Sequence, residues 1–257
     1  MDDEIPFSHT FIIGVERGYS RVGKRVFYKK LIVPAQQGDE GYLTVIWSMK
    51  LCDSFTILRR YVHNIFDYFG LPSHKEQRRS SSKAPLTIVL SSRRKKPFAA
   101  PGQQIGRVIE NEDALAKALR QIPGVKTVIQ QEFFELEYKA QVELVGRADI
   151  LLGMHGAGLT NLIYLAPHAH VIEMVPFTWR SGEFQQLAGI TNHEYRSWQN
   201  QNKTRHIEPS CRELERRNSA SEPNVCRAGP SVTIVDVEEV RAVVEKSVTE
   251  ILGKINN

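Results

Sequence analysis

Residues 154–161, MHGAGLTN, bring a histidine, two glycines, a hydroxyl group and an amide together. Apolar runs on both sides predict a strand, a tight glycine turn and then a helix. Gly156 and Gly158 allow a sharp turn and the close approach of a ligand. The first N–H groups of such a helix, together with its dipole, attract an anion such as phosphate. These groups belong to Ala157, Gly158, Leu159 and Thr160.

The alternative for this segment is a tight turn, capped by Thr160, that binds no ligand. Three known phosphate or oxyanion motifs do not fit the sequence. The glycine turn continues into Asn161, where a dinucleotide-binding loop needs a third small residue, and the chain contains neither G-x-x-x-x-G-K-[ST] nor G-x-S-x-G. Hydride transfer, P-loop hydrolysis and serine hydrolysis are therefore disfavoured.

Arginines lie close to the same predicted site. Arg93 and Arg94 follow a predicted strand over residues 86–92, and Arg107 lies in the connection to the next helix. The planar guanidinium fork suits the oxygens of a diphosphate. A solvated loop is the alternative for the basic run of residues 93–96.

Two further side chains are candidates for chemistry. Glu173 interrupts the apolar segment HVIEMVP, so its carboxylate needs a partner, either a hydroxyl group of a ligand or an arginine. His155 can donate to a phosphate or a sugar, move a proton, or serve as a hydrogen-bonded structural histidine.

The elements that position these residues alternate along the chain. Strands are predicted over 86–92, 125–131, 149–154 and 170–176, with helices over 111–122, 136–148 and 159–166 between them. Asn111 is expected to cap the first of these helices. The alternation predicts a parallel sheet flanked by helices, with ligands bound beyond the carboxyl ends of the strands.

The flanking segments are read more coarsely. An amphipathic helix is predicted over 55–71, a polar linker over 72–85, and a short strand followed by a helix over 231–252.

The 257 residues carry a net charge of +5, a moderate excess that suits an anionic ligand and does not indicate nucleic acid. The sequence shows no signal peptide and no apolar stretch long enough for a membrane span.

Three cysteines without a Cys-x-x-Cys pair argue against a zinc site, and Cys211 with Cys226 is a possible disulfide pair. Asn202-Lys203-Thr204 is a glycosylation sequon. No acidic cluster suited to Mg²⁺ or Mn²⁺ is evident, so we expect no metal and no cofactor.

Residues 146–176, GRADILLGMHGAGLTNLIYLAPHAHVIEMVP, resemble the signature of glycosyltransferase family 61. VLSSRR at 89–94 and RVIENEDAL at 107–115 resemble the arginine-bearing strand exit of that family and its Arg-x-Ile-x-Asn-Glu segment. The helix at 55–71 resembles the one that precedes the donor-binding domain of the family.

The resemblance implies an α/β, GT-B-like architecture in which a Rossmann-type domain binds the nucleotide sugar. Residues 86–257 would form this domain, and residues 1–71 a remnant of a largely absent N-terminal acceptor-side domain with its bridging helix. The implied reaction moves N-acetylglucosamine, xylose or arabinose from a UDP-sugar to a glycan or glycoprotein hydroxyl, with inversion, in the lumen of the Golgi or endoplasmic reticulum.

The residues that the resemblance places at the donor can be named one by one, whereas the catalytic base cannot, because it usually comes from the N-terminal half of such enzymes. Two alternatives remain: an inactive nucleotide-binding module left by truncation, and an unrelated α/β protein that binds a small anion. The donor-site residues are Arg93 or Arg94, Arg107, His155, Gly156, Ala157, Gly158, Leu159, Thr160, Asn161 and, with a less defined role, Glu173.

Overall fold

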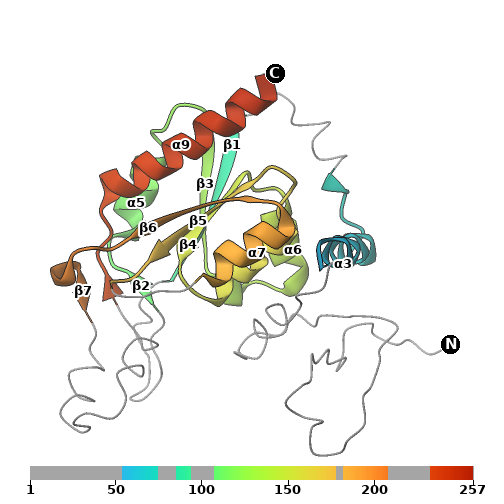
Figure 1. Cartoon of the computed structure of the whole chain (residues 1–257), viewed down its shortest axis with the longest axis horizontal. Coiled ribbons are helices and arrows are strands. Elements are labelled where there is room, and N and C mark those ends of the chain that lie inside the picture. Colours follow the sequence, from blue (N-terminus) through green and yellow to red (C-terminus); the bar gives the residue numbers. More distant parts are fainter. Residues whose placement is uncertain (1–53, 75–84, 94–106, 178–181, 208–231, 257) are drawn as a thin grey trace, which may run out of the picture. The chain divides into compact units, whose positions relative to one another are not determined.

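The computed structural model describes residues 54–74, 85–93, 107–177, 182–207 and 232–256 (Figure 1). The chain divides into two units, Met1–Ser73 and His74–Asn257, which are described separately. Several sequence predictions fall outside the described residues: Arg94, the pair Cys211 and Cys226, residues 75–84 of the linker, and everything before Ser54.

The described part of the first unit is the helix α3, Ser54–Tyr68. It confirms the helix predicted over 55–71, and its Val62, Ile65 and Phe66 are buried at the expected spacing. Gly70, just past the end, has a φ of +62°, a backbone conformation that glycine adopts without the steric penalty of a Cβ.

The second unit is built on a five-stranded sheet in the order β3-β1-β4-β5-β6. All four pairings are parallel, as the alternation of elements predicted. The fifth strand, β6, was not foreseen. The strands are β1 Leu86–Ser91, β3 Val125–Gln131, β4 Ile150–Met154, β5 His170–Val175 and β6 Glu194–Gln199.

Helices cover both faces of this sheet, so the architecture is α/β with a Rossmann-type parallel sheet. Figure 1 shows α5 and α9 on one side, and α6 with α7 on the other. The predicted helix at 159–166 is a 3₁₀ helix that begins at Ala157, and α7 was not foreseen. The helices are α5 Glu112–Leu119, α6 Tyr138–Gly146, α7 Glu183–Thr191 and α9 Val237–Asn256, with 3₁₀ turns η1 Phe133–Glu135, η2 Ala157–Tyr164 and η3 Lys203–Arg205.

The hydrophobic core follows from the two-residue period of the strands. Alternate residues of the sheet pack with α5 and α9 in one buried cluster, while the intervening residues, such as Val89 and Leu151, are buried as well. A sheet buried on both faces reads as continuous apolar runs, which is why β1, β4 and β5 were found from sequence. The cluster includes Ile88, Leu90, Ile150, Leu152, Ile172, Leu115, Leu119, Val240 and Val244.

A second, three-stranded sheet in the order β2-β8-β7 lies beside the start of α5 and α9. It consists of β2 Val108–Ile109, β7 His206–Ile207 and β8 Val232–Thr233. Only β8 was predicted, because it lies in the apolar run VTIV at residues 232–235, whereas β2 and β7 lie in no longer apolar run.

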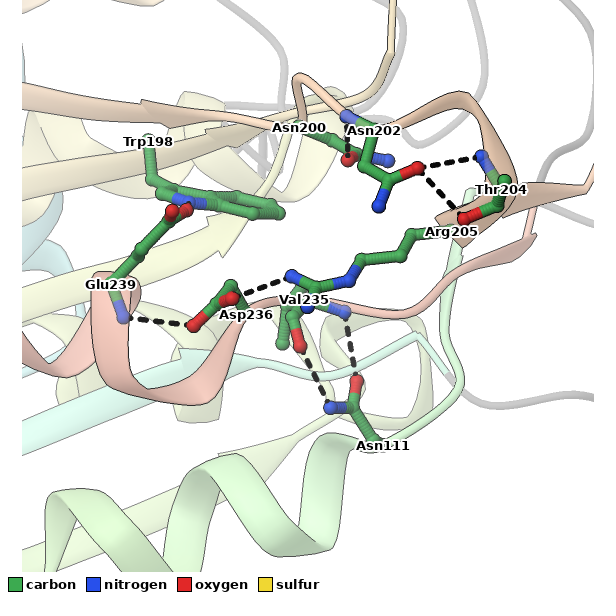
Figure 2. Close-up of polar contacts among 9 residues, drawn as sticks. All are labelled: Asn111, Trp198, Asn200, Asn202, Thr204, Arg205, Val235, Asp236 and Glu239. Carbon is green, nitrogen blue, oxygen red and sulfur yellow. Dashed lines mark hydrogen bonds and ion pairs between the residues drawn. The ribbon is translucent and has the colours of Figure 1, made fainter.

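The expected capping role of Asn111 is wrong in one respect. Its side chain makes no cap hydrogen bond to α5. Instead, Asn111 Nδ2 donates to the Val235 carbonyl at 2.9 Å, and the Val235 N–H donates to Asn111 Oδ1 at 2.9 Å (Figure 2). Both polar groups of the amide are thus used to tie the β2–α5 junction to the segment that leads into α9.

Across the described ranges, no helix combines the length and the apolar character that crossing a bilayer requires.

His170, at the start of β5, makes folding stability depend on pH. It is fully buried, and neither ring nitrogen has a hydrogen-bond partner within the described ranges. Burial lowers its pKa from 6.5 to about 4, because the charged imidazolium is poorly solvated there. At this position the unfolded chain therefore binds a proton more tightly than the folded one. The contribution of His170 to folding stability is fully present above pH 6.5 and is lost as the pH falls towards 4.

We therefore expect the melting temperature of the wild type to drop over this pH window, and the drop to be smaller in His170→Leu. The exposed His63 provides a matched control, because His63→Gln also replaces a histidine but removes no buried side chain. Part of the drop should persist in His170→Leu, since burial also lowers the pKa of His193 to about 4. Identical curves for wild type and His170→Leu would contradict the assignment.

Candidate functional site

The carboxyl ends of β1 and β4 lie side by side and carry the candidate residues. Ser91 pairs with Gly153 in the sheet register, so the segments that leave these two strands start from the same edge. Arg93 follows β1, and His155 and Gly156 follow β4. This is the edge at which open parallel sheets bind ligands.

Arg93 and Arg107, the two candidate arginines within the described residues, both contact the glycine turn. A Cβ placed on Gly156 would lie 2.2 Å from Nη2 of Arg93, so the guanidinium rests directly against this glycine. Gly156 has a φ of +151°, which side chains rarely tolerate. Arg107 Nη1 donates to the His155 carbonyl at 3.1 Å. Arg93, Arg107, His155 and Gly156, predicted from separate segments, are thereby brought together.

The Arg93 guanidinium is a poorly compensated positive charge. Burial, together with the nearby charge of Arg107, lowers its pKa to about 10, although the charge of Glu132 acts in the opposite direction. The guanidinium remains protonated at neutral pH, and within the described part of the chain no side chain accepts a hydrogen bond from it. A buried cation beside another cation favours the binding of an anion.

The start of η2 supplies fewer free N–H groups than expected. The N–H of Leu159 donates to the Gly156 carbonyl at 2.9 Å, so its predicted availability is wrong. The tighter i→i+3 bonding of a 3₁₀ helix accounts for this. The N–H groups of Ala157 and Gly158 donate to no group among the described residues. No side chain, that of Thr160 included, caps this helix.

Gly158 and Asn161 serve packing of the turn. A Cβ on Gly158 would lie 2.5 Å from Ser91 Oγ, so this glycine lets η2 approach the end of β1 and the expected space for a ligand is filled by protein. Asn161 Nδ2 donates to the Gly158 carbonyl at 3.2 Å and to Gln141 Oε1 at 3.4 Å. The first contact stabilises η2 internally, and the second joins η2 to α6.

A buried polar chain lies next to the turn and involves Glu173. His155 Nδ1 hydrogen-bonds to one carboxylate oxygen of Glu173, and the Tyr195 hydroxyl donates to the other. His155 is 3% exposed and Glu173 1% exposed. The partners of Glu173 are thus a histidine and a tyrosine, and neither a ligand hydroxyl group nor an arginine, the two alternatives from the sequence, is needed to engage its oxygens.

The surroundings keep the Tyr195 hydroxyl protonated and hold the His155 ring in place. Burial, reinforced by the charge of Glu173 and the hydrogen bond to it, raises the pKa of Tyr195, which therefore remains a donor. The other ring nitrogen of His155, Nε2, lies 3.7 Å from Glu183 Oε2. The ring of Phe184 meets the imidazole edge-on, with centroids 5.3 Å apart. The imidazole orientation is therefore set from three sides.

Sequence reasoning missed the carboxylate that holds the exit of β1. Ser92 Oγ donates to Glu112 Oε1 at 2.8 Å, and the Arg93 N–H donates to Glu112 Oε2 at 3.3 Å. Gln130 Nε2, at the end of β3, donates to Glu112 Oε1 at 3.0 Å. Glu112 is the last residue of the Arg-x-Ile-x-Asn-Glu segment, but the resemblance assigned it no role.

Tyr195 and Glu183 were missed because they lie on β6 and α7, which the sequence did not reveal. No motif or resemblance included these two positions.

No group of three or more His, Cys, Asp or Glu side chains that could hold a metal ion is found in the described ranges. Metal independence itself stays a prediction.

We expect Gly156→Ala to destabilise the protein by roughly 1–3 kcal/mol, because the new methyl group would displace Arg93 and the backbone conformation is strained for alanine. Gly189→Ala is the matched control, since a Cβ there meets nothing within 4 Å. It lies in α7 and should be neutral or stabilise by up to about 1 kcal/mol. Equilibrium denaturation measures both, and equal stability of the two variants would show that the Arg93 contact is absent.

Comparison with known proteins gives a consistent set of similarities. A family model described as Glycosyltransferase 61 matches residues 24–172, which is more than half of the chain. The EGF domain-specific O-linked N-acetylglucosamine transferase of Gallus gallus is 33% identical over 98 residues, which cover 38% of this chain and 18% of that protein.

Two further relatives extend this picture. The protein of the same name from Drosophila melanogaster is 28% identical over 181 residues, covering 69% of this chain and 31% of that protein. The alpha-1,3-arabinosyltransferase XAT3 of Oryza sativa subsp. japonica is 30% identical over 96 residues, covering 35% of this chain and 16% of that protein. The chain thus spans less than a third of the length of each of these curated relatives.

Proposed function

The chain belongs to glycosyltransferase family 61, and from this premise we propose that it transfers a sugar from a UDP-sugar to a hydroxyl group of a protein or glycan. N-acetylglucosamine and arabinose are the sugars in the names of its relatives, and xylose is the third candidate from the family resemblance. The bond between the anomeric carbon and the diphosphate oxygen breaks as the acceptor oxygen attacks from the opposite face.

The observation that carries the proposal is the poorly compensated Arg93 guanidinium at the glycine turn, with Arg107 beside it. The diphosphate of UDP gains negative charge as it leaves, and two arginines in fixed positions stabilise that charge. The N–H groups of Ala157 and Gly158 add donors at the same edge.

His155, which directly precedes Gly156, helps to hold Arg107 at the turn. Its carbonyl holds Arg107, while Glu173 and Tyr195 hold its ring. The proposal assigns no catalytic base among these residues. A base outside this group accepts the proton that the acceptor hydroxyl loses, in a single displacement with inversion.

We place the protein in the lumen of the Golgi or endoplasmic reticulum. The support is the family and the glycosyltransferase names of its relatives. The acceptor is accordingly a glycan or glycoprotein.

Arg93→Gln should weaken UDP binding roughly 10- to 100-fold, since a charge-assisted hydrogen bond contributes about 1.5–3 kcal/mol. Calorimetry with UDP and a panel of UDP-sugars measures this. Arg147→Gln is the matched control, because Arg147 is exposed and precedes β4, at the opposite edge of the sheet. Equal UDP affinity in wild type and Arg93→Gln would remove the basis of the proposed donor site.

Two further assays separate the rival functions. An inactive nucleotide-binding module would bind UDP but release none from a UDP-sugar in the presence of acceptor. An unrelated anion-binding protein would be stabilised equally by sulfate and by UDP in a thermal shift assay. Ligand at about 100 times its dissociation constant adds roughly 2.7 kcal/mol, which such an assay detects.

We expect transfer and UDP affinity to persist in excess chelator, because the arginines and backbone N–H groups provide the positive field that a metal would otherwise supply. The assay compares UDP release before and after dialysis against chelator. Loss of transfer that Mn²⁺ or Mg²⁺ restores would contradict this expectation.

A further inference from the structure

The turn after β6 contains Asn202-Lys203-Thr204, which is the only Asn-x-Ser/Thr triplet in the 257 residues. We propose that Asn202 is modified by an N-linked glycan. The proposal rests on the proposed function in one respect only, the location in the secretory lumen, where the required transferase acts. The proposed donor site plays no part in it.

The side chain of Asn202 is arranged so that its amide nitrogen is available. Its Oδ1 accepts hydrogen bonds from the Thr204 N–H at 2.9 Å and from the Thr204 hydroxyl at 2.7 Å (Figure 2). Nδ2 makes no hydrogen bond to any described residue. Asn202, Lys203 and Thr204 are all exposed, so a bulky sugar attached there displaces no packed side chain.

The neighbouring Asn200 shows the contrast within the same turn. It is 1% exposed, and its Oδ1 accepts from the Asn202 N–H at 2.9 Å. Asn200 has Asn202 instead of a hydroxyl residue two positions on, so it is not a sequon. Of the two amides, only Asn202 combines the triplet with access to solvent.

The turn itself is anchored independently of the proposed glycan. Arg205 forms an ion pair with Asp236 at 2.6 Å (Figure 2). The Arg205 carbonyl accepts a hydrogen bond from the Ile234 N–H at 2.9 Å. The Arg205 N–H donates to the Asn202 carbonyl at 3.1 Å. A modification at Asn202 therefore extends from a fixed turn into solvent without loosening the small sheet.

The chemical step is a substitution that needs one co-substrate, an oligosaccharide linked to a polyprenyl diphosphate. Asn202 Nδ2 attacks the anomeric carbon of that oligosaccharide and loses one proton. The new C–N bond replaces the C–O bond to the diphosphate, which leaves with both electrons of that bond. The hydroxyl of Thr204 completes the recognised triplet.

The test is to secrete the full chain from cultured animal cells behind a cleavable signal sequence and treat it with peptide N-glycosidase. The wild type should increase in mobility on treatment, and mass spectrometry should find the Asn202 peptide converted to aspartate. Asn202→Asp and Thr204→Ala should run at the deglycosylated position without treatment, whereas Thr204→Ser should keep the shift.

Asn202→Asp is the sharpest of these variants because it keeps Oδ1, and with it both hydrogen bonds from Thr204, while it removes the reacting nitrogen. Wild-type protein whose Asn202 peptide is recovered unmodified overturns the proposal, as does a shift that persists in Asn202→Asp. The readout is a mass and needs no sugar donor. A failure here is therefore distinguishable from a failure of UDP binding or transfer.

Discussion

The Arg93 guanidinium, buried against Gly156 and close to a second arginine, is the constraint on which the arrangement of this site depends. A cation in that position is unfavourable unless an anion arrives, so the protein must hold it there by other means. Glu112 does so by fixing the backbone of Arg93 and the hydroxyl of Ser92. The positively charged groups of this edge are thus held in position by contacts within the protein, and positioned charges of this kind favour the binding of an anion.

The glycine-rich motif divides into residues that face the charge and residues that only make the turn possible. Gly156 accommodates Arg93, and Ala157 and Gly158 present N–H groups, whereas the missing Cβ of Gly158 and the amide of Asn161 serve close packing. A motif of this kind therefore does not translate into a row of ligand contacts. Several of its residues instead allow η2, the end of β1 and the Arg93 guanidinium to pack closely together.

Strands buried on both faces of the sheet left a clear signal in the sequence, whereas the polar edge strand β6 left none. The runs LTIVLS and ILLGM could be assigned because nearly every position is apolar and buried. The edge strand β6, EYRSWQ, has mostly polar and half-exposed residues, so no periodicity marks it. Asn111 satisfied every sequence rule for a helix cap, yet its amide bonds to Val235, a partner 124 positions away that local reasoning cannot see.

The same limit explains why the prediction of the site stopped at Glu173. Its presence within an apolar strand showed that a partner was needed, but one of its two partners, Tyr195, lies on a strand that the sequence did not reveal. The three side chains of this polar chain come from the end of β4, from β5 and from β6, which are neighbours only in the folded sheet. Because Glu173 engages both His155 and Tyr195, the orientation of the glycine turn depends on an edge strand that contributes no residue to the motif. The arrangement of this edge therefore depends on the order of the whole sheet, and the signature sequence specifies only its centre.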